Sequence, residues 1–144
     1  MGARDAAARG MAAGFAGTVA LTLSQRLEMR LTGRPPSDLP AQVAEGVLGI
    51  SPRGRARERA AFAAHWLNNS SSGLGRAALA GIGLRGAPAA GATFALYFAG
   101  MTLLFRRLDL APPRAIDLAH ASVWAIATSA AYDLLSRSSR EIEG

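Results

Sequence analysis

The most restrictive feature of the sequence is residues 86–105, twenty consecutive residues without Asp, Glu, Lys or Arg. Large apolar side chains fall on every side of a helix drawn through this stretch, at Phe94, Leu96, Phe98, Met101 and Leu103. About 20 residues rising about 1.5 Å each cross the ~30 Å hydrocarbon core of a bilayer. A surface helix of a soluble protein keeps a polar stripe instead. The stretch therefore predicts a transmembrane helix.

Three further segments, 10–25, 60–75 and 118–132, are also free of charge, and charged residues at their ends are placed to reach lipid headgroups. The pattern predicts an all-α fold: a four-helix transmembrane bundle forming a single membrane domain over 1–144. The expected helices span about 8–30, 57–84, 87–106 and 114–136. A soluble alanine-rich helical bundle is the alternative, since an apolar content of 50% also occurs in soluble proteins.

Cysteine is absent, which excludes disulfides, thiolate nucleophiles and cysteine-ligated metals. Arg4 and Arg9 before an apolar run resemble the start of a secretory signal. The helical pattern continues through Gln25, Arg26 and Glu28 without a small-residue cleavage site. We expect an uncleaved anchor.

Small residues recur at four-residue spacing, for example at Gly10 and Gly14 and along Gly73, Ala77 and Gly81. Such ridges let helix backbones approach closely in lipid. Glycine inside a helix costs about 1 kcal/mol, so a packing reason is expected for the ridge that starts at Gly73.

The loop after the first span predicts a short surface helix over about 38–50, with a capping side chain at Ser37 or Asp38 and an early proline at Pro40. Leu39, Val43 and Val47 share one face of this helix. An apolar face of this kind suits a helix on the membrane surface or against the end of the bundle.

A run of arginines follows at Arg53, Arg55, Arg57 and Arg59. Arginine binds the phosphates of nucleic acids as well as those of lipids, but no aromatic side chain is interleaved here and no base-reading motif accompanies the run. Next to a span, the expected partners are the anionic headgroups of membrane lipids, and no nucleic acid. Arginines concentrate in 26–59 and 106–114, and by the positive-inside rule these loops face the cytoplasm.

Several short motifs together resemble the small multi-pass inner-membrane proteins of the YagU-like kind. The motifs are Gly14-Phe15-Ala16-Gly17-Thr18, Thr22, Glu28, Thr32-Gly33-Arg34-Pro35-Pro36-Ser37, His65-Trp66 and Ala131-Tyr132-Asp133. The resemblance implies a multi-pass protein of the bacterial cytoplasmic (inner) membrane, and it supplies no catalytic residues.

Ionisable side chains at membrane depth are costly and are candidates for function. His65 and His120 lie a few residues inside their spans, and counting places both near the surface where Glu28 leaves the first span. In a structural reading, these histidines, Asn69 and Asp117 bond to one another and to the loop backbone. In a second reading, His65, Asp117 and His120 bind a metal or protons. In a third, the histidines are axial ligands of a haem.

At the other end, Arg76 and Asp133 each lie sixteen residues into their helices, counted from Ala60 and Asp117. We predict an Arg76–Asp133 ion pair assisted by Tyr132, since an unpaired arginine inside a span must otherwise extend its side chain to the headgroups.

No dinucleotide-binding, phosphate-loop or metalloprotease motif occurs. The sequence predicts no enzymatic activity and no cofactor, but a structural or accessory membrane protein within a homo-oligomer or larger membrane complex. A small transporter or a protein that handles metal or protons through the His/Asp cluster is the alternative. A soluble arginine-rich nucleic-acid binder is the third class.

Overall fold

The computed structural model describes residues 2–143, and the side chains as far as residue 138. This part of the chain forms five α-helices and no strand, so the predicted all-α class is correct. The helices are α1 (Ala3–Thr32), α2 (Leu39–Leu48), α3 (Gly54–Gly81), α4 (Gly86–Arg107) and α5 (Ala115–Glu143).

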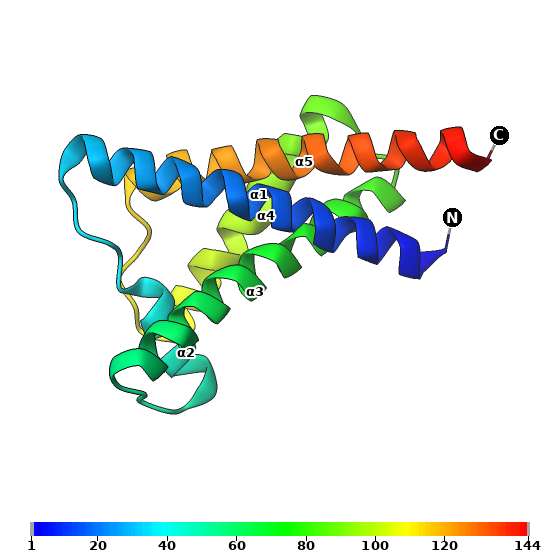
Figure 1. The fold of residues 1–144 in the computed structure, drawn as a ribbon. Helices are drawn as coiled ribbons and strands as arrows, with labels where there is room; N and C mark the ends of the chain where they lie inside the picture. The colour runs from blue at the N-terminus through cyan, green and yellow to red at the C-terminus, as the bar shows by residue number, and fades with distance from the viewer. Residues whose placement is uncertain (1, 144) are drawn as a thin grey trace.

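Four long helices alternate in direction, and the short α2 lies at one end of them (Figure 1). Helices α1 and α5 run antiparallel side by side, while α3 and α4 cross them at an angle. The connections on either side of α2 and the α4–α5 connection share one end, which we call the α2 end. The two termini and the α3–α4 turn lie at the opposite end.

The helix boundaries follow from local signals. Gly33 adopts a left-handed conformation (φ 70°) after α1 and donates its N–H to the carbonyl of Met29, and Gly49 ends α2 in the same way. Asp38 precedes α2, but its side chain makes no capping bond. The Asp38 carboxylate binds the guanidinium of Arg57 instead, and the Leu39 N–H donates to Ser37 Oγ at 3.3 Å.

Close approach of α1 and α3 depends on glycine. A Cβ atom on Gly14 would lie 2.2 Å from the carbonyl oxygen of Ser70, and one on Gly73 would lie 2.1 Å from that of Gly10. The ridge expected at Gly73 therefore packs as predicted, and Ala77 is buried with it. A Cβ atom on Gly81 would meet nothing within 4 Å, so extending the ridge to Gly81 is wrong; α3 ends there.

Apolar and polar side chains are distributed in an unusual way. Large apolar side chains face outward along α1 at every fourth position: Met11, Phe15, Val19, Leu23, Leu27 and Leu31. Polar and charged side chains fill much of the interior: Thr18, Asn69, Ser70, Arg76, Thr93, His120, Thr128 and Ser129. This is the reverse of the usual distribution in a water-soluble domain.

Helices α1 and α4 are long and apolar enough to cross a bilayer. The predicted spans in α3 and α5 lack an apolar stretch of this length and hydropathy, because polar residues such as Asn68, Asn69 and Asp133 interrupt them. Only 17% of the most apolar stretch of α4 is buried, and Leu96 and Leu103 are more than half exposed. The helix that is apolar on all sides thus lies on the outside of the bundle.

Candidate functional site

A cavity of about 290 Å³ opens at the α2 end, with all five helices contributing to its wall. His65, Asn69, Asp117 and His120, which the sequence analysis grouped together, all line it. The α1–α2 connection closes one side through Arg34 and neighbouring residues.

One side of the cavity is a directed chain of hydrogen bonds. The Tyr97 hydroxyl donates to Asn69 Oδ1 (2.6 Å), and the Asn69 amide donates to the His65 carbonyl (2.7 Å) and faces His65 Nδ1 (3.3 Å). The Thr22 hydroxyl donates to the Thr18 carbonyl (2.7 Å) and lies 2.9 Å from His65 Nε2. Since Nδ1 accepts and Thr22 has used its proton, these bonds assign a neutral His65 with its proton on Nε2.

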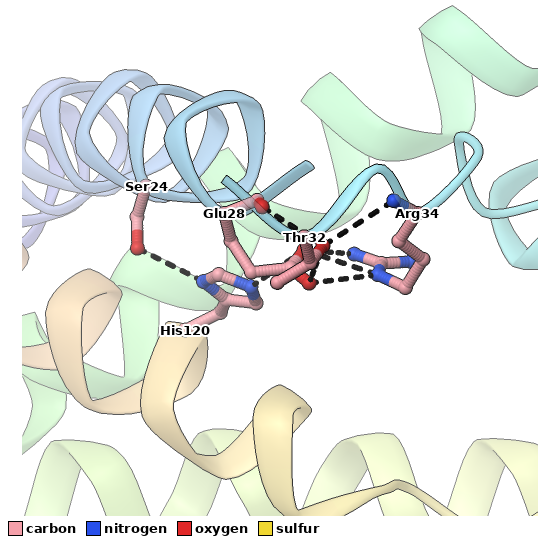
Figure 2. A network of polar contacts seen from close by, with 5 residues as sticks. All are labelled: Ser24, Glu28, Thr32, Arg34 and His120. Carbon is pink, nitrogen blue, oxygen red and sulfur yellow. Dashed lines mark hydrogen bonds and ion pairs between the residues drawn. The ribbon is translucent and has the colours of Figure 1, made fainter. Parts of the chain in front are cut away.

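The opposite side joins α5 to α1 and to the following loop (Figure 2). His120 Nδ1 lies 2.9 Å from Ser24 Oγ, and His120 Nε2 lies 3.9 Å from Glu28 Oε2. Glu28 accepts hydrogen bonds from Arg34 Nη2 (2.6 Å) and Nε and from the Thr32 hydroxyl (3.0 Å). The sequence prediction placed Glu28 near both histidines, and the structure brings it next to His120.

Arg34 forms an ion pair with Glu28 and is also influenced by the charge of Asp117. The hydrogen bonds that Arg34 donates to Glu28, and to a lesser degree the charges of Glu28 and Asp117, raise the pKa of Arg34. Asp117 is in the first turn of α5, where it accepts the backbone N–H of Arg114 at 2.7 Å. A carboxylate at this position also interacts favourably with the helix dipole.

The predicted metal-binding role of His65, Asp117 and His120 is not supported. No group of three or more His, Cys, Asp or Glu side chains suited to a metal ion occurs in the part of the chain that the structure describes. The three residues line one cavity, but each is engaged elsewhere: His65 with Thr22 and Asn69, Asp117 with the loop backbone, and His120 with Ser24. These contacts follow the structural reading instead.

The arginine run divides into one bound and three exposed side chains. Arg57 donates to Asp38 (2.6 and 2.8 Å) and to Glu45 (2.6 Å), and so clamps α2 onto the start of α3. The hydrogen bonds between them lower the pKa of Asp38 and raise that of Arg57. Arg57 was also predicted to contact lipid headgroups; in the structure two carboxylates occupy its guanidinium. Arg53, Arg55 and Arg59 are exposed.

At the far end, the predicted Arg76–Asp133 ion pair is present. The Arg76 side chain is fully buried, and its Cζ lies 4.7 Å from the centre of the Tyr132 ring, a cation–π contact. The interaction with Tyr132 is through the ring face. The simple extension of Arg76 to the headgroups does not occur.

Four polar residues that bond to the predicted site residues were not anticipated: Thr22, Ser24, Arg34 and Tyr97. Thr22 and Ser24 interrupt an otherwise apolar span, as Tyr97 does in α4, and isolated polar residues in such spans are a usable signal. Arg34 carries no comparable signal because only the fold of the loop brings it back to Glu28.

Comparison with models of protein families, with curated proteins and with solved structures finds no match to this chain.

Proposed function

We propose that this chain is an integral membrane protein that crosses the bilayer four times, through α1, α3, α4 and α5. The observation that carries the proposal is the position of α4. This helix is apolar on all sides, and yet only 17% of its most apolar stretch is buried. In water, such a helix belongs at the centre of a domain. In lipid, a position on the outside of the bundle is the expected one.

The polar residues of α3 and α5 are compatible with this arrangement. Arg76 lies inside the bundle and is paired with Asp133, and Asn69 is bonded to Tyr97 and His65. Polar groups are costly in contact with lipid, so a helix can carry them on the face that turns toward the bundle while its apolar neighbours contact lipid.

The resemblance to YagU-like proteins and the arginine asymmetry complete the proposal. They favour the bacterial cytoplasmic membrane, with the α2 end in the cytoplasm, where Arg53, Arg55 and Arg59 contact anionic headgroups. We propose a structural or accessory role without catalysis, in an oligomer or a larger membrane complex.

Single cysteines test the topology directly, since the natural chain has none. Ser51→Cys places a thiol at the α2 end, and Ile82→Cys places one in the α3–α4 turn, where Ile82 is 79% exposed. In intact cells, a membrane-impermeant maleimide should label Ile82→Cys at once and Ser51→Cys only after permeabilisation. The cysteine-free chain is the matched control.

Labelling of both thiols under the same condition would show that α3 does not cross the membrane. Recovery of the chain in the soluble fraction without detergent would contradict the membrane proposal as a whole and would favour the soluble bundle. Retention in the pellet after alkaline carbonate washing is the expected result.

A further inference from the structure

The apolar side chains of α2 and of the residue after Gly49 serve two different surroundings. Leu39 and Val43 line the cavity at the end of the bundle. Val47 and Leu48 in the last turn, and Ile50 just after the helix, are each more than half exposed. The apolar face of this helix is therefore used inside the protein only at its start, and its end presents three large apolar side chains to the outside.

Unpaired positive charge follows directly along the chain. Arg53, Arg55 and Arg59 are exposed, and within residues 2–138 no side chain forms a hydrogen bond or ion pair with them. The acid among them, Glu58, is exposed as well. Three guanidinium groups against one carboxylate leave this surface positive. We call residues 47–59, with their exposed apolar side chains and arginines, the α2–α3 corner.

The corner is held in shape by ion pairs. Arg57, near the start of α3, binds both Asp38 and Glu45 of α2 at 2.6 Å. Gly49 (φ 65°) and Gly54 (φ 55°) adopt the left-handed conformation on either side of the connection, so the chain can reverse between the helices. The exposed side chains are thus carried by a preformed projection of the protein.

The corner projects sideways from the bundle. In Figure 1, α2 and its connection to α3 lie to the side of the bundle, away from α1 and α5, and they do not extend beyond the end of α1. Arg59 immediately precedes the charge-free segment 60–75, so the proposed path of α3 places the arginines at the depth of the headgroups. Elements with apolar side chains on one side and arginines on the other bind in this interfacial layer.

We propose that the α2–α3 corner is a binding site for anionic lipid, in which the apolar side chains enter the edge of the hydrocarbon layer and the arginines bind phosphate groups. Arginine binds phosphate through two parallel hydrogen bonds. Charge complementarity favours a lipid with net negative charge, since the ammonium group of phosphatidylcholine offsets its phosphate. The inference rests on the proposed membrane location and extends it, because contact between arginines and headgroups does not by itself require insertion of apolar side chains.

A fluorescent probe on a single cysteine tests the insertion. The full chain with Leu48→Cys carries the environment-sensitive nitrobenzoxadiazole group and is reconstituted in phosphatidylcholine vesicles with or without phosphatidylglycerol. With phosphatidylglycerol, a lipid that bears a nitroxide at the top of its acyl chain should quench most of the fluorescence. Ala111→Cys, at an exposed position of the α4–α5 connection at the same end, is the matched control and should be quenched little.

Two triple variants, each combined with the labelled Leu48→Cys, test the role of the charges. One replaces the unpaired arginines of the corner: Arg53→Gln, Arg55→Gln and Arg59→Gln. The other replaces three exposed arginines at the same end but outside the corner: Arg106→Gln, Arg107→Gln and Arg114→Gln. Because one basic residue near an anionic surface favours binding about fivefold, the first variant should lose most of the dependence on phosphatidylglycerol and the second should keep it.

Three outcomes would overturn the inference: equal quenching at positions 48 and 111, quenching that does not depend on phosphatidylglycerol, or equal losses in the two triple variants. The first would leave the corner to water or to a protein partner. The natural chain decides the question even if a variant does not fold, since phosphatidylglycerol should slow tryptic cleavage after Arg53 more than cleavage after Arg114. A chain that does not float with the vesicles contradicts the proposed function before the probe is read, which keeps the two failures distinct.

Discussion

The buried Arg76–Asp133 pair makes the sharpest stability prediction. Arg76 is fully buried, whereas the Asp133 side chain is 30% exposed. Asp133→Ala therefore leaves a buried guanidinium with only the Tyr132 ring beside it, and breaking a buried pair in this way typically costs about 3–5 kcal/mol. For a chain of this size, that cost corresponds to a fall in Tm of roughly 10 °C.

Removing Arg76 instead of Asp133 is expected to reduce the stability less. Arg76→Met keeps an apolar side chain in the same space, and the partly exposed Asp133 carboxylate can be hydrated at the end of the bundle. The double variant Arg76→Met with Asp133→Ala should be about as stable as Arg76→Met alone. The coupling energy between the two sites then equals the cost of Asp133→Ala alone, about 3–5 kcal/mol.

Thermal unfolding of the four proteins in one detergent, followed by circular dichroism at 222 nm, measures this cycle. Leu134→Ala, a neighbouring change at an exposed position, is the matched control and should shift Tm little. Strict additivity of the two substitutions would refute the pairing, and so would an Asp133→Ala protein as stable as the natural chain.

Three other predictions concern packing, pH and the arginine run. Gly14→Ala should destabilise the fold strongly because its Cβ meets the Ser70 carbonyl, whereas Gly91→Ala, with open space around it, should be neutral or stabilising by up to about 1 kcal/mol; Tm comparison decides. Arg57 lowers the pKa of Asp38 below its ordinary value of 3.8, so their pair stabilises the fold above that value and the contribution disappears as the pH falls through the lowered pKa. The Tm difference between the natural chain and Asp38→Asn should therefore shrink from about pH 5 to about pH 3, and a constant difference would contradict this. Arg57→Ala should speed limited proteolysis of the 49–53 connection, whereas Arg55→Ala, at an exposed arginine, should not.

Counting along the sequence was sufficient where helices are long and regular. The equal depths of Arg76 and Asp133 follow from the fixed rise per residue, so their pairing was predictable from two helix starts. The grouping of His65 and His120 at one end, with Glu28 beside His120, has the same origin.

Contacts made by loops could not be predicted in this way. Arg57 and Asp38 are nineteen residues apart, and only the return of α2 against α3 brings them together. Arg34 reaches Glu28 because the chain turns at Gly33. The spacing of apolar residues predicts helices but not the direction of such a turn. The cavity depends on all five helices at once, so no single stretch of sequence encodes it.

The glycine contacts between α1 and α3, together with the large apolar side chains on the outside, predict an inverted map of mutational tolerance. At the proposed membrane location, the bulky positions, such as Phe15 or Leu23, should accept almost any apolar replacement, because fluid hydrocarbon imposes no shape. The smallest residues, such as Gly14 and Gly73, should accept none. In a deep mutational scan, substitutions at these smallest residues should therefore be the most damaging in the chain.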